Sequence, residues 1–368
     1  MIKQREHFHG SDLEKIEQVF HIKKEDITSF SANVNPLGIS YKLRETLANH
    51  IDAITSYPDR EYASLRKSIG SYVGTDMENI LVGNGSTELI SIFIQYIKPK
   101  KAILLAPTYS EYEREITLAG GICEYHFVKE ENNFILDKDA LLQDLTDDVN
   151  LLIICNPNNP TSVSIPNKTI AEILSYCETH NIFVLIDETY VEFAPDMEQV
   201  TSIPLTKDFK NLIILRGVSK FFASPGLRLG YAICSNQEFL KLVNEKKNPW
   251  TINSLAAIAG EIMFTDTEYI AQTKNLIFSE RKKCCDRMKK RKDLKVYEPT
   301  ANFVLVKILN DKVTAYELFE ECIKKCLMIR DCSTFQSLDD SFFRFCFMMP
   351  EKNEELLDVI FEYLDRHE

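Results

Sequence analysis

The stretch LIILRGVSKFFASPGLRLGYAIC, residues 212–234, places a polar segment between two apolar runs. The runs 212–215 and 231–234 are short and rich in β-branched or aromatic residues, which is typical of buried strands. Between them, Pro225-Gly226 is a strong turn signal. The stretch therefore predicts a strand, a polar turn and a second strand.

The same strand pattern recurs along the middle of the chain. From about residue 79, short apolar runs alternate with segments whose apolar residues have helical spacing. Strands separated by helices imply right-handed crossovers, a mainly parallel sheet and ligands at the carboxyl ends of the strands. We therefore expect an α/β fold with a central sheet flanked by helices. The expected strands are 80–82, 102–105, 151–155, 183–186, 212–215 and 231–234, and the expected helices include 87–96 and 169–179.

The two ends of the chain have a different pattern. Residues 1–45 contain a helix-like segment and then an irregular stretch at 30–38, and the chain after residue 250 contains long amphipathic helices and two strand-like runs. We interpret residues 46–250 as a large domain. Residues 1–45 and 251–368 are interpreted as a smaller α+β domain built from both termini.

The amino-acid composition of the chain argues against several classes of function. The 368-residue chain has a formal net charge of -12, which argues against binding to nucleic acid or anionic membranes. It has no apolar run near the roughly 18 residues of a membrane span, and no signal-peptide pattern. Its ten cysteines lack zinc-site spacing, so we expect reduced thiols, a cytoplasmic location and no metal. Local donors must then hold any anionic ligand.

The turn after the first apolar run contains Ser219, Lys220 and Arg228 within ten residues. A lysine at a strand end is ordinarily a solvated surface charge. An amine beside a cation, however, has a lowered pKa and is a better nucleophile toward an aldehyde. A hydroxyl and a guanidinium are donors suited to a phosphate. This context favours a catalytic role for Lys220.

Other polar motifs follow the neighbouring strands. Asp187 could be a simple helix N-cap, or it could stabilise a protonated pyridine nitrogen, with Tyr190 reaching the phenolic oxygen of the same ring. Asn159 lies in a turn and could donate to that oxygen. The glycine turn Gly85-Ser86-Thr87 begins a helix, where free N–H groups bind phosphate. Tyr109 is either an aromatic side chain packed in the core or a ring that stacks on the same pyridine ring.

The order of these motifs resembles fold type I enzymes of the aminotransferase superfamily, which depend on pyridoxal 5′-phosphate (PLP). The resemblance implies that residues 46–250 bind PLP and that Lys220 holds it as a Schiff base. It implies catalytic roles for three residues, Lys220, Asp187 and Tyr190. The cofactor-binding residues would be Gly85, Ser86, Thr87, Tyr109, Asn159, Asp187, Tyr190, Ser219, Lys220 and Arg228, with Tyr57 from the neighbouring subunit of a homodimer.

Motifs near the termini narrow the resemblance. His9-Gly10, the stretch 30–38, Pro249-Trp250 and the segment 329–332 are similar to L-threonine-O-3-phosphate decarboxylases of cobalamin biosynthesis, with histidinol-phosphate aminotransferases as neighbours. This implies that Arg344 clamps the substrate carboxylate. Arg330, with His9, would hold the substrate phosphate, and Asn33 would also bind substrate.

The predicted function is decarboxylation of a phosphorylated or phosphonate amino acid through an external aldimine at Lys220. The alternative is an aminotransferase that acts on histidinol phosphate or a related amine. A non-catalytic module of a transcription regulator is disfavoured because no basic helix-turn-helix segment precedes residue 30. The chain departs from the decarboxylase pattern at Asp12, where an Asn is typical, and at Met348, where a basic residue is usual.

Overall fold

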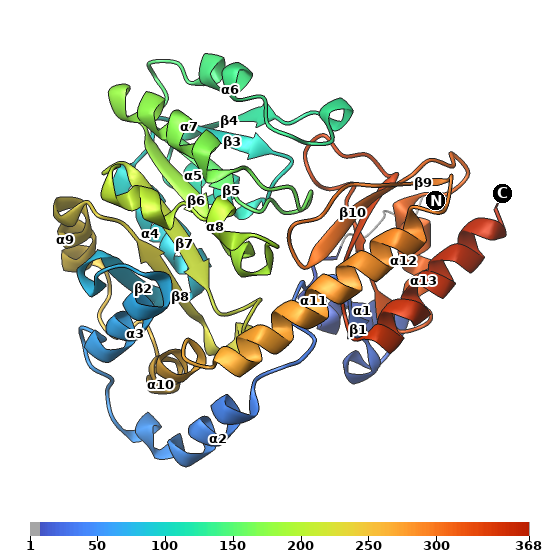
Figure 1. Cartoon of the computed structure of the whole chain (residues 1–368), viewed down its shortest axis with the longest axis horizontal. Helices are drawn as coiled ribbons and strands as arrows, with labels where there is room; N and C mark the ends of the chain where they lie inside the picture. The colour runs from blue at the N-terminus through green and yellow to red at the C-terminus, as the bar shows by residue number, and fades with distance from the viewer. Residues whose placement is uncertain (1–7, 368) are drawn as a thin grey trace.

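The computed structural model describes residues 8–367 (Figure 1). The helices are α1 Leu13–Phe20, α2 Tyr41–Asn49, α3 Ala63–Val73, α4 Gly85–Ile97, α5 Glu111–Leu118, α6 Lys138–Asp144, α7 Asn167–Thr179, α8 Met197–Val200, α9 Gln237–Lys246, α10 Ser254–Met263, α11 Thr267–Met288, α12 Ala315–Ile323 and α13 Pro350–Asp365. The strands are β1 Thr28–Ser29, β2 Ile80–Asn84, β3 Lys101–Ala106, β4 Ile122–Phe127, β5 Leu151–Cys155, β6 Phe183–Asp187, β7 Leu212–Gly217, β8 Leu229–Ile233, β9 Leu294–Val296, β10 Phe303–Ile308, β11 Leu327–Met328, β12 Arg330–Asp331 and β13 Phe342–Cys346.

The larger sheet has seven strands in the order β2-β8-β7-β6-β5-β3-β4. Neighbours from β7 to β4 run parallel, whereas β8 is antiparallel to both β2 and β7. The predicted α/β fold with a mainly parallel sheet is therefore confirmed. Each of the six predicted strands is present, with ends that differ by a few residues.

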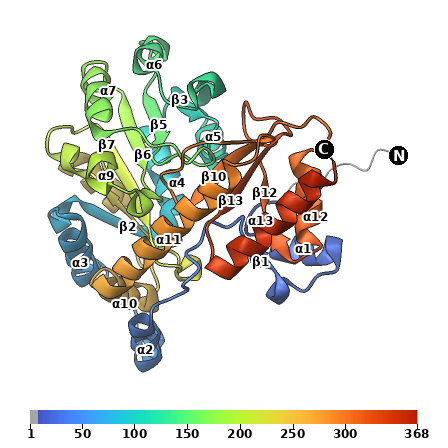
Figure 2. The ribbon, with the colours of Figure 1, turned by 45° about the vertical axis from the view of Figure 1, so that its right-hand side comes forward.

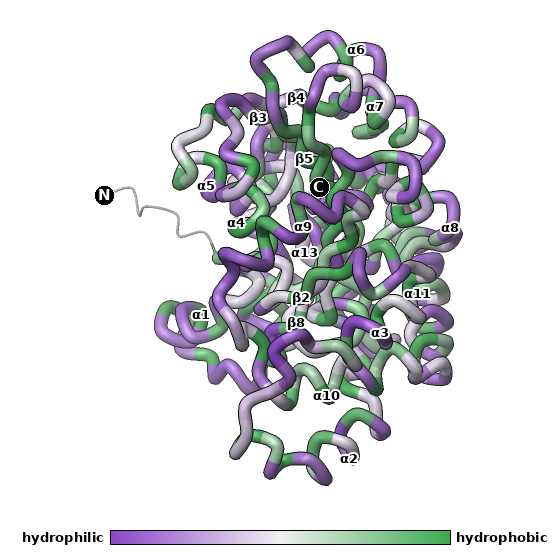
Figure 3. The backbone as a smooth tube through the Cα atoms, turned by 90° about the vertical axis from the view of Figure 1, so that its left-hand side faces the viewer, coloured by the Kyte–Doolittle hydropathy of each residue, from purple (hydrophilic) through white to green (hydrophobic). Residues whose placement is uncertain are grey.

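Both faces of this sheet are covered, which explains its unbroken apolar runs. Alternate residues of one strand belong to different core clusters: Ile213 packs with α4, α5 and α9, and Ile214 packs with α7 and α10. Figure 3 shows hydrophobic segments gathered in the middle of this layer and hydrophilic ones on the outer helices. The carboxyl ends of the strands are thus the open edge at which polar side chains can gather.

Strand β4 was not predicted, because it is an edge strand with a mixed pattern. Its residue Ile122 is 62% exposed, and only His126 of the strand is buried. A strand that pairs on one side only does not need the continuous apolar run of a central strand.

The smaller sheet has the order β12-β13-β10-β9 and is antiparallel throughout. A separate pair of short parallel strands, β1 and β11, joins the N-terminal segment to the C-terminal part. The long helix α11 runs between the two sheet regions in Figure 2. The N-terminal segment that follows β1 therefore lies beside the strands β12 and β13 that carry the predicted substrate arginines.

No helix within residues 8–367 has the length and apolar character needed to cross a membrane. All ten cysteines are free thiols.

Candidate active site

Three neighbouring strands bring the predicted catalytic residues to one edge of the large sheet. Asp187 ends β6, and the register pairs it with Cys155 at the end of β5 and with Leu215 in β7. Lys220 lies in the turn after β7. The parallel order of the strands thus places the lysine and the carboxylate on the same side of the sheet, as expected from their positions in the sequence.

The Lys220 amine contacts the N-terminal segment that follows β1. Its Nζ donates a hydrogen bond to the carbonyl oxygen of Ala32, at 2.6 Å. Burial and, after it, the positive charges of Arg344 and Arg228 together lower the pKa of Lys220 to about 8. A substantial fraction of the amine is therefore neutral near physiological pH, which is the form that attacks an aldehyde.

The Asp187 carboxylate is buried and hydrogen-bonded on both oxygens. Oδ1 accepts hydrogen bonds from the backbone N–H of Thr189 at 2.9 Å and from its hydroxyl at 2.5 Å. Oδ2 accepts one from the Tyr112 hydroxyl at 2.8 Å. Burial raises the pKa of Asp187, and these hydrogen bonds oppose that rise. A carboxylate held in this way is suited to pair with a protonated ring nitrogen.

A cradle for a phosphate lies where β2 meets α4. Gly85 has a φ of +76°, a conformation that favours glycine, and it begins this helix, whose first-turn N–H groups have no partner within the helix. A Cβ on Gly85 would lie 2.3 Å from Nη2 of Arg228. The guanidinium therefore lies directly against the glycine, and Ser86, Thr87 and Ser219 supply half-buried hydroxyls from the same two turns. This cradle fits the phosphate of PLP.

The residues predicted to surround the cofactor ring also converge. Tyr109 is half-buried beside Tyr112, with ring centroids 5.6 Å apart, and burial raises its pKa to about 12. The Tyr190 hydroxyl accepts a hydrogen bond from the Asn33 amide at 3.3 Å. Asn159 Oδ1 accepts one from Arg344. Asn33 Oδ1 itself has no partner, although it is buried.

Two arginines face each other on the smaller sheet. Arg330 on β12 is directly opposite Arg344 on β13, and the two residues are 6% and 4% exposed. Like charges in opposite positions destabilise a sheet. Neither guanidinium forms a salt bridge with a carboxylate of residues 8–367, and burial and the charge of Arg344 both lower the pKa of Arg330. An anionic ligand would offset this cost.

The hydrogen bonds of the two arginines fix their positions, but one donor of Arg344 remains without a partner. Arg330 donates to the carbonyl of Phe8 and, at 2.9 Å, to the Thr334 hydroxyl. Arg344 donates at 2.8 Å to the carbonyl of Ser31, but its buried Nε has no partner. The Ser31 hydroxyl is also buried without a partner. Buried donors without partners are positions at which a ligand can complete the hydrogen bonding.

His9 and Tyr57 lie outside this cluster. His9 is exposed, and its backbone N–H donates to Asp12 at 2.8 Å. Tyr57 is 83% exposed, and its ring lies 5.1 Å from that of Trp250. Within one subunit, the structure does not bring Tyr57 to the phosphate cradle.

Three residues beside the site were not predicted: Tyr112, Ser31 and Thr334. Tyr112 lies in α5, whereas Tyr109 precedes the start of that helix at Glu111, so no helical spacing in the sequence links the two residues. The positions of Ser31 and Thr334 depend on contacts between distant segments. No local pattern points to them.

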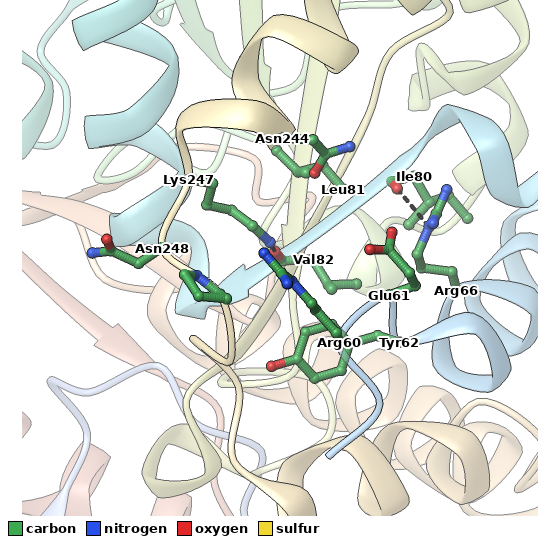
Figure 4. A pocket seen from close by; sticks show the side chains of 11 residues that line it. Arg60, Glu61, Tyr62, Arg66, Ile80, Leu81, Val82, Asn244, Lys247 and Asn248 are labelled. Carbon is green, nitrogen blue, oxygen red and sulfur yellow. Dashed lines mark hydrogen bonds between the residues drawn. The ribbon is translucent and has the colours of Figure 1, made fainter. Parts of the chain in front are cut away.

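A separate cavity of about 240 Å³ lies along the edge strand β2 (Figure 4). Lys247 donates to the carbonyl of Val82 at 2.8 Å, and Arg66 donates to that of Ile80 at 3.1 Å. These cations satisfy the outward carbonyls of an edge strand, which otherwise could pair with another chain. The cavity therefore has a structural explanation and contains none of the predicted catalytic residues.

Comparisons with known proteins show the family of this chain. The family aminotransferase class I and II matches residues 25–360. A protein of Caldanaerobacter subterraneus, provisionally assigned as a threonine-phosphate decarboxylase, is 37% identical over 89% of this chain and 88% of its own length. The threonine-phosphate decarboxylase of Salmonella typhimurium is 30% identical over 96% and 95%. The crystal structure of the histidinol-phosphate aminotransferase from Clostridium acetobutylicum has a TM-score of 0.85 and 32% identity, covering 92% of this chain and 99% of that one.

Proposed function

This chain belongs to the class I and II aminotransferase family and is a PLP-dependent enzyme, and on that premise we propose that it decarboxylates a phosphorylated or phosphonate amino acid. PLP, when bound, supplies an electron-withdrawing ring that stabilises negative charge at the α-carbon of the substrate. Similarity to two threonine-phosphate decarboxylases over most of the chain supports this activity.

The proposed roles follow from the positions of the side chains. Lys220 would bind the cofactor aldehyde, and Asp187 would pair with the ring nitrogen. The cradle of Gly85, Ser86 and Arg228 would hold the cofactor phosphate. After CO₂ leaves, the α-carbon needs a proton, and the protonated form of Lys220 would donate it, because a pKa lowered to about 8 makes this ammonium a better acid than a solvated lysine.

The arginine pair is the observation that carries the choice of substrate. Arg344 would bind the α-carboxylate through its free Nε, and Arg330 would bind the phosphate. Two buried cations on neighbouring strands suit a ligand with two anionic groups. A substrate with only one anionic group would leave one guanidinium buried without a counter-charge.

A panel of ligands tests this proposal. The purified holoenzyme would be mixed with threonine phosphate, serine phosphate, histidinol phosphate and phosphonoalanine, and the cofactor absorbance and released CO₂ would be recorded. We expect CO₂ without added amino acceptor from at least one ligand that has both a carboxylate and a phosphate or phosphonate. If no ligand of the panel changes the cofactor spectrum, the proposal is wrong.

The second candidate is an aminotransferase of histidinol phosphate or a related amine. It is supported by the likeness to the Clostridium acetobutylicum aminotransferase, whose identity to this chain is 32%. Incubation with 2-oxoglutarate separates the two activities. Formation of glutamate would support the aminotransferase, whereas CO₂ release that does not depend on 2-oxoglutarate would support the decarboxylase.

We also propose that the active enzyme is a cytoplasmic homodimer in which Tyr57 reaches the phosphate cradle of the partner. The ten free thiols suit a reducing compartment. Large exposed apolar side chains gather on and after α2 and beside Trp250 and would be buried in a dimer, and these are Tyr41, Ile51, Ile54 and Tyr57. Light scattering of the holoenzyme should give twice the mass of the 42.4 kDa chain, and Tyr57→Ala should weaken cofactor binding.

A further inference from the structure

The buried Asp187 carboxylate receives its hydrogen bonds from two different places. Thr189, two residues further along the same loop, donates both its bonds to Oδ1. Tyr112 donates to Oδ2 from helix α5, which is 75 positions away in sequence. The Tyr112 side chain is 1% exposed. The buried Tyr112 hydroxyl therefore binds the one oxygen of Asp187 that receives no hydrogen bond from Thr189.

The number of acceptor sites on the Asp187 carboxylate shows which oxygen is available to a further donor. A carboxylate has about four lone-pair sites, two on each oxygen. The two bonds from Thr189 occupy Oδ1, and the bond from Tyr112 occupies half of Oδ2. The remaining site is on Oδ2, so a further donor must bind the oxygen that Tyr112 already holds.

We infer that Tyr112 is a positioning residue for the cofactor, which orients Oδ2 of Asp187 toward the ring nitrogen. This inference rests on the proposed role of Asp187. The Tyr112 ring also meets the ring of Tyr109 edge-on, at 5.6 Å and 87°. One side chain thus contacts both the carboxylate for the ring nitrogen and the aromatic proposed to stack on the ring.

Electrostatics agrees with this geometry. Burial raises the pKa of Asp187, which favours a neutral carboxylic acid, and the Tyr112 hydrogen bond acts in the opposite direction. Burial and the nearby Asp187 charge raise the pKa of Tyr112, so the phenol remains a donor at neutral pH. Without this donor, a shared proton would move from the ring nitrogen toward the carboxylate, and the ring would withdraw electrons less well.

The test compares two cofactors that differ only at the ring nitrogen. Apoprotein would be titrated with PLP and with its 1-deaza analogue, in which carbon replaces that nitrogen, and the Kd of each would be measured. Tyr112→Phe should raise the Kd of PLP about tenfold, the effect of losing a hydrogen bond to a charged group. The Kd of the deaza analogue should stay within about twofold, because no ring nitrogen is present to interact with Asp187.

Two further variants make the outcome specific. Tyr176→Phe is the matched control, because it removes a half-buried hydroxyl that donates to the carbonyl of Leu145 at 3.2 Å, and it should change neither Kd. Asp187→Asn tests the premise and should also weaken PLP more than the analogue. If Asp187→Asn weakens both cofactors equally, the proposed role of Asp187 is wrong. A different result overturns the inference about Tyr112: Asp187→Asn weakens the binding of PLP more than that of the analogue, while Tyr112→Phe changes both Kd values equally or neither.

Discussion

The surroundings of Lys220 determine its protonation state, and the protonation state determines whether its amine can attack an aldehyde. Burial alone favours the neutral amine, and Arg344 adds a nearby positive charge in the same direction. The pKa of about 8 means that the neutral fraction increases as the pH rises from 7 to 9. A solvated lysine would need a much higher pH to reach the same fraction.

The rate at which apoprotein captures PLP should therefore rise with pH and level off above about 8. Rapid mixing with absorbance detection, over a range of about pH 6 to 10, measures the midpoint of this rise. In Arg344→Met the midpoint should move to higher pH, because one cause of the lowered pKa is removed. A wild-type midpoint near the ordinary lysine value would contradict the assignment of Lys220.

Asp12 adds a negative charge beside the proposed phosphate site, and it is among the groups that raise the pKa of Arg330. Asp12→Asn keeps an acceptor for the His9 N–H but removes this charge. We expect the KM of a phosphorylated substrate to fall by about two- to fivefold, the scale of a partly exposed charge interaction.

The matched control for this charge is Glu14→Gln. Glu14 lies in the first turn of α1, the helix that Asp12 precedes, but it pairs with Lys24 at 3.1 Å. This variant should leave KM unchanged. An equal effect of both variants would mean that only net charge matters.

Local motifs predicted most of the candidate site, because each chemical group follows a strand directly. Lys220, Asp187 and Asn159 could be proposed from their own neighbours in sequence. Tyr112 and Ser31 could not, because their roles depend on contacts with residues that only the folded chain brings near, such as the hydrogen bond between Tyr112 and Asp187 across 75 positions.

Among the elements, β8 and the start of α4 approach each other closely beside the phosphate cradle. A Cβ on Gly230 would lie 2.5 Å from both the carbonyl carbon of Gly85 and the N of Ser86. Real Cβ atoms do not approach backbone this closely, so the phosphate cradle would have to shift. The position of the cradle thus depends on the absence of a side chain in the neighbouring strand.

Gly230→Ala should weaken PLP binding at least about tenfold, because displacement of the cradle costs hydrogen bonds to a charged phosphate. Titration of apoprotein with PLP measures this loss. Gly226→Ala is the control, since a Cβ there would meet no atom within 4 Å. Equal affinities for both variants would show that the cradle tolerates the shift.

The sequence pattern predicted central strands better than peripheral ones, for a physical reason. Strands β5, β6 and β7 are buried on both faces and read as continuous apolar runs. The short strands β1 and β11 each contain two residues, which is too few for any periodicity. Their pairing depends on the approach of the two chain ends.

Across the whole molecule, Glu130 joins the segment after β4 to the smaller sheet. It accepts hydrogen bonds from Lys307 at 2.8 Å, Tyr297 at 2.7 Å and Lys295 at 3.3 Å. Burial raises the pKa of Glu130, but these three donors outweigh burial and the net pKa is lowered. A carboxylate whose pKa is lower in the folded state stabilises the fold above its unfolded pKa, and this contribution is lost as the pH falls through the folded value.

Glu130→Gln should therefore lower the Tm by about 1–4 °C at pH 7, with a smaller difference below about pH 4. Thermal unfolding of both proteins over this pH range provides the measurement. Glu131→Gln, at the exposed neighbouring position, should unfold like the wild type throughout. A constant difference for Glu130→Gln at every pH would contradict the assigned charge.

The aromatic pair of Tyr57 and Trp250 has a practical consequence at this scale. Trp250 is the only tryptophan in the chain, and it is 43% exposed beside the exposed tyrosine. Its intrinsic fluorescence thus reports on one spot of the surface without any added label. If two subunits meet there, dilution should shift the emission to longer wavelength as the indole enters water, so that a simple fluorimeter can follow the association.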